Sequence, residues 1–140
     1  MKYRKAGDRY VVRIDRGEEV VTELLRLAEA EQIGCASIVG LGAADRVTVG
    51  LYNVETKQFE KTTFTEPLEV SSIIGNFSRK DGKAYQHIHV TVCNTAMQAF
   101  GGHLVECRIS GTAELFVTVL DMELGRVFDE ETGLNLFHFA

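Results

Sequence analysis

At 140 residues the chain is long enough to form one domain with its own hydrophobic core, and we expect a single domain over residues 1–140. Hydrophobic residues make up 45% of the sequence and charged residues 25%, a composition typical of an ordinary globular protein and not of a disordered tail. The net charge of −5 argues against extensive phosphate binding, because nonspecific affinity for DNA depends on clustered Lys and Arg.

Neither a membrane helix nor a signal peptide is predicted. No segment approaches the roughly 18 consecutive apolar residues that a membrane helix needs, and the basic start is not followed by an apolar signal core. We therefore expect a cytoplasmic protein. Cys35, Cys93 and Cys107 are odd in number and lie inside apolar runs, which indicates reduced core cysteines and not a disulfide framework.

The N-terminal part of the chain predicts a strand followed by a helix. The strand spans residues 10–15, after a polar, basic leader that we expect to be loosely ordered. A turn follows, in which Glu18 and Glu19 are favourably placed near a helix N-terminus. From Val20 onward apolar residues recur at helical spacing until Gly34, a suitable C′ residue. This is the only helix that we predict.

Three strands are predicted next. Residues 35–44 are small and apolar, and Gly40 and Gly42 indicate close packing or a bulge. The run G-L-G-A-A-D lacks the third glycine of a dinucleotide fingerprint and is followed by a strand pattern, so we predict no cofactor-binding residues there. Residues 46–53 alternate and lead through a polar turn into residues 58–64, which together predict a hairpin.

Pro67 opens a longer predicted strand over residues 68–77. The segment 78–83 then contains Asp81-Gly82, a pair typical of a tight hairpin turn. Three basic residues in this segment are a weak signal for nucleic-acid binding, because charges on a turn are more often simply solvated.

The best-defined polar cluster of the sequence follows in residues 86–92. Alternation predicts a strand with Ile88, Val90 and Val92 on its inner face and His87, His89 and Thr91 on its outer face. Two histidines at i and i+2 on a strand lie roughly 6.5 to 7 Å apart at their Cα atoms, a separation from which both imidazoles can converge on one ion.

A third histidine, His103, is placed where the chain would return as an antiparallel partner of this strand. Gly101-Gly102, just before it, can turn sharply and let other groups come close to the backbone. Three neutral imidazoles with an open fourth position are a known zinc arrangement, and the open position admits water or substrate. We therefore predict zinc bound by His87, His89 and His103. The alternative is that these histidines are structural or surface residues.

The rest of the chain predicts a loop and three more strands. The loop, residues 94–100, contains Met97 and Phe100, which we expect to cover the site or a neighbouring subunit. Strands are predicted at residues 104–109 and 112–120, and the second is apolar enough to be buried on both faces.

The C-terminal residues 134–139 alternate like a final strand, and we expect His138 to face solvent or a neighbour and not to complete the metal site. One helix followed by about eight strands predicts an α+β fold, a mostly antiparallel sheet with the N-terminal helix packed on it. Apolar residues on strand faces that should be wet indicate burial of a sheet face by self-association.

Several short motifs match one family over nearly the whole chain, most clearly over residues 69–121. They are Leu68-Glu69-Val70, Gly75-Asn76, His87-Ile88-His89-Val90, Gly101-Gly102-His103-Leu104 and Ala113-Glu114-Leu115, with Arg16-Gly17-Glu18, Ile33-Gly34-Cys35-Ala36 and Gly40-Leu41-Gly42 upstream. In these motifs the chain resembles the PPC domain family (plants and prokaryotes conserved domain, DUF296), also called PD1-like "putative DNA-binding" proteins.

The resemblance implies an α+β fold around an antiparallel sheet, assembly as a homotrimer, and a metal site formed in prokaryotic members by the residues matched here by His87, His89 and His103. Plant members join this domain to AT-hooks, basic segments that enter the DNA minor groove, and this sequence has no such segment. Together with the acidic composition, this means that the DNA-binding name of the family rests on association more than on residues of this chain.

Three functions therefore stay open. The first is a trimeric protein of DNA-associated or regulatory assemblies with zinc at its histidine cluster. The second is a zinc-dependent enzyme or small-ligand-binding protein that uses the open coordination position. No catalytic residue is identified for it, and Glu106 and Glu114 are candidates for a general base only by their proximity in sequence. The third is a structural zinc that holds strands or subunits together.

Overall fold

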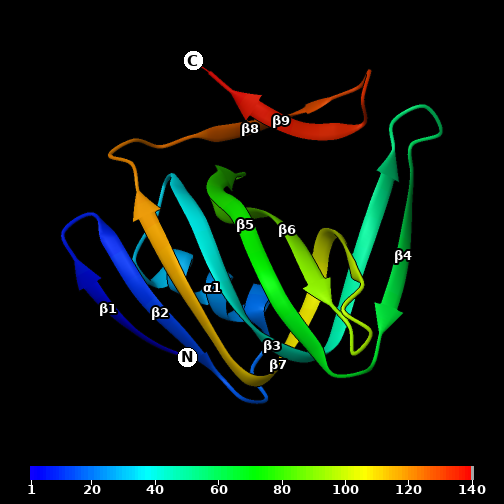
Figure 1. The fold of residues 1–140 in the computed structure, drawn as a ribbon. Coiled ribbons are helices and arrows are strands. Elements are labelled where there is room, and N and C mark those ends of the chain that lie inside the picture. Colours follow the sequence, from blue (N-terminus) through cyan, green and yellow to red (C-terminus); the bar gives the residue numbers. More distant parts are fainter. Residues whose placement is uncertain (140) are drawn as a thin grey trace.

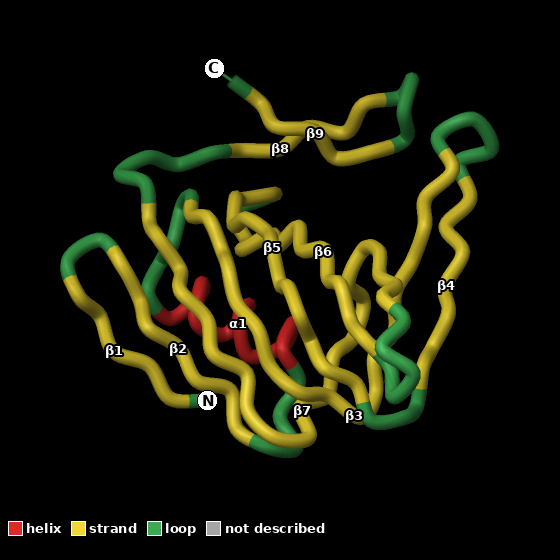
Figure 2. Tube along the Cα trace, in the orientation of Figure 1, coloured by secondary structure: helices red, strands yellow, loops and turns green. Residues whose placement is uncertain are grey.

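The computed structural model describes residues 1–139, which form one helix and a nine-stranded sheet (Figures 1 and 2). The elements in chain order are β1 (Lys2–Ala6), β2 (Arg9–Asp15), α1 (Val20–Ala30), β3 (Ala36–Asn53), β4 (Gln58–Phe64), β5 (Leu68–Lys80), β6 (Lys83–Cys93), β7 (Ala99–Val119), β8 (Gly125–Asp129) and β9 (Leu134–His138). The mostly antiparallel α+β fold is as predicted, with nine strands in place of about eight. The strands that the sequence did not predict are β1 and β8.

The sheet runs in the order β1-β2-β7-β3-β5-β8-β9, with β4 added to β3 and β6 paired with both β5 and β7. Strands β3, β5, β6 and β7 therefore form a closed circuit of pairings. All pairings are antiparallel except the bridge between Arg79 of β5 and Gly125 of β8. The β3–β4 hairpin rises at one side of the sheet, and the β8–β9 hairpin crosses above it (Figure 1).

The helix begins where the sequence predicts because an acidic side chain caps it. The carboxylate of Glu19 accepts hydrogen bonds from the backbone N–H groups of Val21 at 2.9 Å and Thr22 at 2.7 Å. The buried helix face packs against the inner face of the sheet and carries Val20, Leu24, Leu27 and Ala28.

The helix ends differently from the expectation. It stops at Ala30, and the residue with left-handed backbone that follows it is Gln32, with φ of 51°. The predicted cap at Gly34 is therefore wrong. Gly34 instead allows a close approach, because a Cβ atom there would lie 2.8 Å from the carbonyl oxygen of Met122.

Two predicted pairs of strands are each one continuous strand. Residues 36–53 form β3 without a break, and the predicted strands on either side of Gly111 merge into β7. The glycines of β3 bend the strand without ending it: the register with β5 shifts between Gly40 and Gly42, and a Cβ on Gly42 would lie 2.6 Å from the carbonyl oxygen of Thr112. The predicted bulge is confirmed.

Of two predictions for segments near the sheet edges, one is wrong and one is confirmed. The basic leader is not loosely ordered, because residues 2–6 pair with β2 across a turn at Gly7, which has φ of 62°. The predicted tight turn at Asp81-Gly82 is confirmed, because both residues have left-handed backbone, with φ of 51° at Asp81 and 75° at Gly82.

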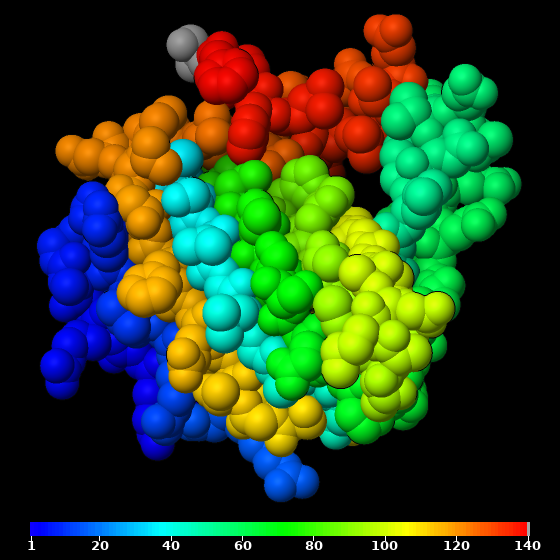
Figure 3. All heavy atoms as spheres, viewed as in Figure 1, coloured from blue at the N-terminus to red at the C-terminus, as the bar shows by residue number. Residues whose placement is uncertain are grey.

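The outer face of the sheet, opposite α1, exposes a line of apolar side chains that we call the apolar row. Val11, Phe116, Val39 and Ile74 are register partners across β2, β7, β3 and β5, and they are 46%, 52%, 55% and 61% exposed. The prediction that residues 112–120 are buried on both faces is therefore wrong. Figure 3 shows this face, with β7, β3 and β5 side by side and α1 hidden behind them. No helix within residues 1–139 is long and apolar enough to cross a membrane.

Candidate metal centre

The histidine pair lies on the outer face of β6 because the alternate residues of that strand are buried in the core. Ile88 and Val90 are almost fully buried, which turns His87 and His89 to the opposite face. Their Nε2 atoms lie 3.3 Å apart. The predicted strand and its orientation are confirmed.

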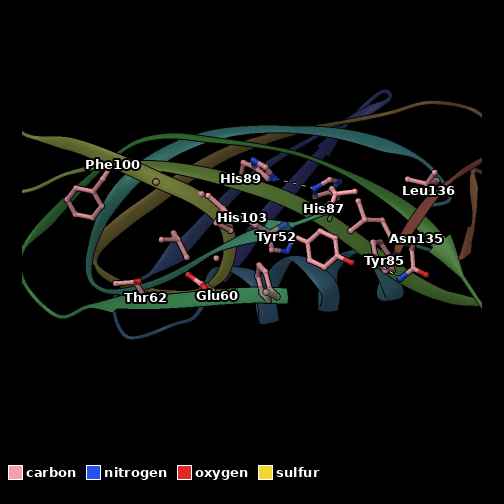
Figure 4. A pocket seen from close by; sticks show the side chains of 18 of the residues that line it. Tyr52, Glu60, Thr62, Tyr85, His87, His89, Phe100, His103, Asn135 and Leu136 are labelled. Atoms are coloured by element: carbon pink, nitrogen blue, oxygen red, sulfur yellow. Dashed lines mark hydrogen bonds between the residues drawn. The ribbon is translucent and has the colours of Figure 1, made fainter. Parts of the chain in front are cut away.

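The third histidine comes from the neighbouring strand, as the sequence predicts. His103 of β7 is the register partner of His89, and its ring centroid lies 5.3 Å from that of His87 and 5.5 Å from that of His89. One ring nitrogen from each of the three side chains lies within 4.8 Å of the other two. Figure 4 shows the three imidazoles close together on one side of a cavity.

The two glycines before His103 bring β7 close to β6 and β3. They lie inside β7 and do not form the sharp turn that we predicted. A Cβ on Gly101 would collide with the carbonyl oxygen of Val90, and one on Gly102 would lie 2.8 Å from the carbonyl oxygen of Gly50. The other part of the prediction, a close approach of the backbone, is confirmed.

The surroundings of His87 and His103 favour the neutral form of these two imidazoles. Burial, together with charge repulsion from the neighbouring His103, His89 and Arg126, lowers the pKa of His87 to about 4. Burial also lowers the pKa of His103, with a smaller effect from His89. Neutral imidazoles are the form that binds a metal ion.

The cluster opens into a cavity of about 1050 Å³. Most of its wall is apolar or aromatic, and it is built by β3, β4, β6, β7, β8 and β9. The lining residues are Val49, Gly50, Leu51, Tyr52, Val54, Phe59, Glu60, Thr62, Phe64, Tyr85, His87, His89, Phe100, Gly101, Gly102, His103, Arg126, Leu134, Asn135, Leu136 and Phe137. In Figure 4, Tyr85, Asn135 and Leu136 gather on the His87 side, and Phe100 lies on the other.

Two charged residues of this wall were missed by the sequence analysis. Glu60 of β4 is the one carboxylate, and Arg126 of β8 is the one guanidinium, among the described residues that line the cavity. Neither has a motif around it, and both are brought to the histidines by long-range pairing. Glu106 and Glu114, the earlier candidates for a general base, do not line the cavity. Glu106 instead pairs with Arg46 at 3.1 Å.

Arg126 is held by neutral groups. Its Nε donates to Ser78 Oγ at 2.7 Å, its Nη1 to the Asn135 carbonyl oxygen at 2.7 Å, and its Nη2 to Asn76 Oδ1 at 3.0 Å. The guanidinium carbon lies 4.7 Å from the ring centroid of Tyr85 and 4.3 Å from that of Phe137. Burial lowers the pKa of Arg126, although an arginine side chain stays charged in proteins.

The remaining predictions for this region have mixed outcomes. Phe100 lines the cavity and packs on Phe64 with ring centroids 4.2 Å apart, so it covers the site as expected. Met97 is 80% exposed and does not line this cavity. His138 is exposed and is not part of the cluster, as predicted.

The donor set suits zinc. Two nitrogen ligands of a tetrahedral zinc ion, each about 2.0 to 2.1 Å from the metal, lie roughly 3.3 to 3.4 Å apart. The 3.3 Å between the Nε2 atoms of His87 and His89 has this value, and one ring nitrogen of His103 lies within 4.8 Å of a nitrogen of each.

Comparison with known proteins gives a consistent result. A model of the Plants and Prokaryotes Conserved (PCC) domain matches residues 1–121. No curated protein sequence matches the chain. A solved structure from Bacteroides thetaiotaomicron, named a "putative DNA-binding protein", is similar with 32% identity and a TM-score of 0.96, covering 99% of this chain and 96% of that one.

Two archaeal structures are also similar. One is a "metal-containing protein" from Archaeoglobus fulgidus, with 35% identity and a TM-score of 0.89 over 99% of this chain and 100% of that one. The other is a plant- and prokaryote-conserved (PPC) protein from Pyrococcus horikoshii, with 31% identity and a TM-score of 0.87 over 99% of this chain and 96% of that one.

Proposed function

The chain belongs to the family of the Plants and Prokaryotes Conserved (PCC) domain, and from that starting point we propose that it binds a zinc ion and uses it to hold a small ligand. His87, His89 and His103 would be the metal ligands. The observation that supports this best is that the three imidazoles face a large cavity and not a closed core. A bound zinc ion would supply Lewis acidity at its open position.

A purely structural zinc fits the site less well. Structural zinc sites are closed by four protein ligands, whereas catalytic and ligand-binding sites keep a position open. Among the described residues, the cluster of possible metal ligands contains the three histidines and no fourth His, Cys, Asp or Glu. A metal-containing relative of 35% identity supports the same assignment.

The protein acts in this proposal as a homotrimer. The apolar row is the surface that supports self-association, because four large apolar side chains lie exposed in one line. The row ends next to the histidines, since Ile74 is the register partner of His89. A subunit interface on this face would therefore adjoin the metal centre.

DNA binding is the second candidate function, and the charge distribution supports the β1–β2 edge as the contact surface. Six of the 15 Lys and Arg residues fall in the first 16 positions: Lys2, Arg4, Lys5, Arg9, Arg13 and Arg16. They lie on and just after the exposed β1–β2 edge, where Asp8 and Asp15 are the acidic residues. This local excess of positive charge is the feature that supports contact with a phosphate backbone.

The metal proposal is tested by elemental analysis of untagged protein purified without chelator. We expect close to one zinc per chain in the wild type and its loss in His89→Ala. The matched control is His138→Ala, which removes an exposed histidine outside the cluster and should keep the metal. Circular dichroism shows whether each variant is folded. A wild-type protein that stays free of metal even after incubation with zinc would refute the proposal.

The DNA proposal is tested by titrating the protein with duplex DNA at several salt concentrations. Binding through the β1–β2 edge should weaken steeply as salt rises, and it should weaken further in Arg4→Ala/Arg9→Ala. The control is Lys80→Ala/Lys83→Ala, which removes the same charge from the Asp81-Gly82 turn. No binding at low salt, or equal losses in both variants, would argue against this edge.

A further inference from the structure

The charges around the candidate centre do not balance. A divalent ion held by three neutral imidazoles keeps its full charge, and the guanidinium of Arg126 lines the same cavity. The one carboxylate in the described cavity wall is Glu60, which offsets only part of this positive charge. Unbalanced charge in a partly desolvated site is costly, so the site favours an anionic occupant.

Within the described chain, the guanidinium of Arg126 has both an unpaired charge and N–H donors with which to bind such an anion. No carboxylate within residues 1–139 lies within ion-pair distance of its guanidinium. A guanidinium has five N–H donors, and the bonds to Ser78, Asn135 and Asn76 use three of them. One N–H on Nη1 and one on Nη2 are left, which is the pair that a carboxylate accepts in a bidentate contact.

The position of Arg126 is fixed by its surroundings. The three hydrogen bonds come from β5 and β9, and the rings of Tyr85 and Phe137 lie against the guanidinium. A side chain held in this way loses little further rotamer freedom when a ligand binds. Ser78, which accepts one of these bonds, is fully buried, so the anchor is part of the core.

The remaining wall selects the other part of the ligand. Aromatic and aliphatic side chains make up most of the cavity, and Phe100 and Phe64 close the end away from Tyr85. A cavity of about 1050 Å³ with a few polar groups is typical of a site for an organic molecule and larger than an inorganic anion needs.

We propose that the ligand is a small organic carboxylate with an apolar body, whose carboxylate lies between the metal and Arg126 and whose body fills the apolar part of the cavity. This inference rests on the proposed metal centre. It adds the chemical class of the ligand and assigns Arg126 as the residue that recognises its charge.

The test uses the zinc-loaded full chain and three probes in isothermal titration calorimetry: 2-naphthoate, its uncharged analogue 2-naphthamide, and acetate. We expect 2-naphthoate to bind most tightly, because it has both the charge and the apolar body. Arg126→Met should weaken 2-naphthoate binding on the order of 10- to 100-fold and leave 2-naphthamide unchanged. Zinc content should stay as in the wild type.

Two further variants keep the test decisive. Arg108→Met removes an arginine that pairs with Asp45 outside the cavity, and it should bind 2-naphthoate like the wild type. If Arg126→Met does not fold, Arg126→Lys is used instead. It keeps the charge but lacks the pair of N–H donors that makes a bidentate contact, so we expect an intermediate loss of affinity for 2-naphthoate.

Equal affinities for 2-naphthoate and 2-naphthamide in the wild type, or an unchanged affinity in the folded Arg126 variant, would overturn the inference. The proposed metal centre would survive that result if zinc is still present. A wild-type protein without zinc would overturn both.

Discussion

His87 has the most strongly shifted proton equilibrium among the histidines of the centre, and this gives a pH prediction for the metal-free protein. Its pKa is about 4 in the folded chain, whereas in the unfolded chain it is near 6.5, the ordinary value of a histidine. Between these pH values the unfolded chain binds more protons than the folded one, so the free energy of unfolding rises with pH from 4 to 6.5 and gains nothing more from this group above that.

The measurement is urea unfolding of chelator-treated protein across this pH range. His87→Gln cannot take up the proton, so its stability should depend less on pH than that of the wild type. Carboxylates that titrate in the same range contribute equally to both proteins and cancel in the difference. His138→Gln, an exposed histidine, should keep the wild-type slope. Identical slopes for wild type and His87→Gln would contradict the prediction.

The residues of the centre differ in how visible they are in the sequence. His87 and His89 could be predicted because two-residue alternation along one strand places them on the same face. His103 could be predicted because it follows in the next strand. Glu60 and Arg126 could not, since β4 and β8 reach the cavity through pairings and contacts that no local pattern encodes.

At the scale of the element, Gly101 decides how closely β7 pairs with β6. A methyl group there would meet the carbonyl oxygen of Val90, which is backbone and cannot move aside without shifting the strand. We expect Gly101→Ala to lower the free energy of unfolding by about 1 to 3 kcal/mol. It should also weaken zinc binding, because His89 and His103 face each other across this pairing.

Gly111→Ala is the matched control in the same strand. A Cβ at Gly111 would lie 3.5 Å from the Cβ of Ala43, an ordinary van der Waals contact, so this variant should keep both its stability and its zinc. Chemical denaturation and zinc titration measure the two effects. Equal behaviour of the two variants would show that close approach at Gly101 is not what positions the histidines.

Local signals predicted some elements well and failed at others. The Asp81-Gly82 turn and the start of α1 at Val20, capped by Glu19, depend on a few neighbouring residues, and the sequence predicted both. The continuity of β7 through Gly111 depends on its long partner β3, which pairs with it on both sides of that glycine. A glycine inside a paired strand and a glycine in a turn look the same in the sequence.

For the whole molecule, the apolar row predicts the assembly state. We expect wild-type protein to have a mass in solution near three times that of the 15.5 kDa chain. Ile74→Lys/Phe116→Lys places two charges on the row and should give monomers, because a desolvated unpaired charge is costly in an interface. Light scattering coupled to size exclusion measures the mass.

Met97→Lys adds a charge at a more exposed apolar residue outside the row, and this control should keep the wild-type mass. A wild-type monomer would refute the trimer, and a trimer in the double variant would show that the interface lies on another surface.

The sequence predicted that a sheet face is covered by self-association, but it also predicted that residues 112–120 are buried on both faces, which is wrong. Phe116 is exposed on the outer face of the single chain. An apolar side chain that a neighbouring subunit would cover looks the same in the sequence as one in the core of its own chain.

The β6–β7 hairpin has a consequence for the order of events in folding. All three histidines lie within residues 87–103, joined by a short loop in which Asn94 Oδ1 accepts hydrogen bonds from the backbone N–H groups of Ala96 and Gln98. Closing this loop costs far less chain entropy than pairing Ala36 with Val119, which β3 and β7 require. In the proposed zinc-bound protein, the ion would therefore bind the hairpin before the rest of the sheet has assembled. Zinc would then speed up folding as well as slow unfolding. The β6–β7 hairpin with its bound ion would act as the folding nucleus of the newly made chain.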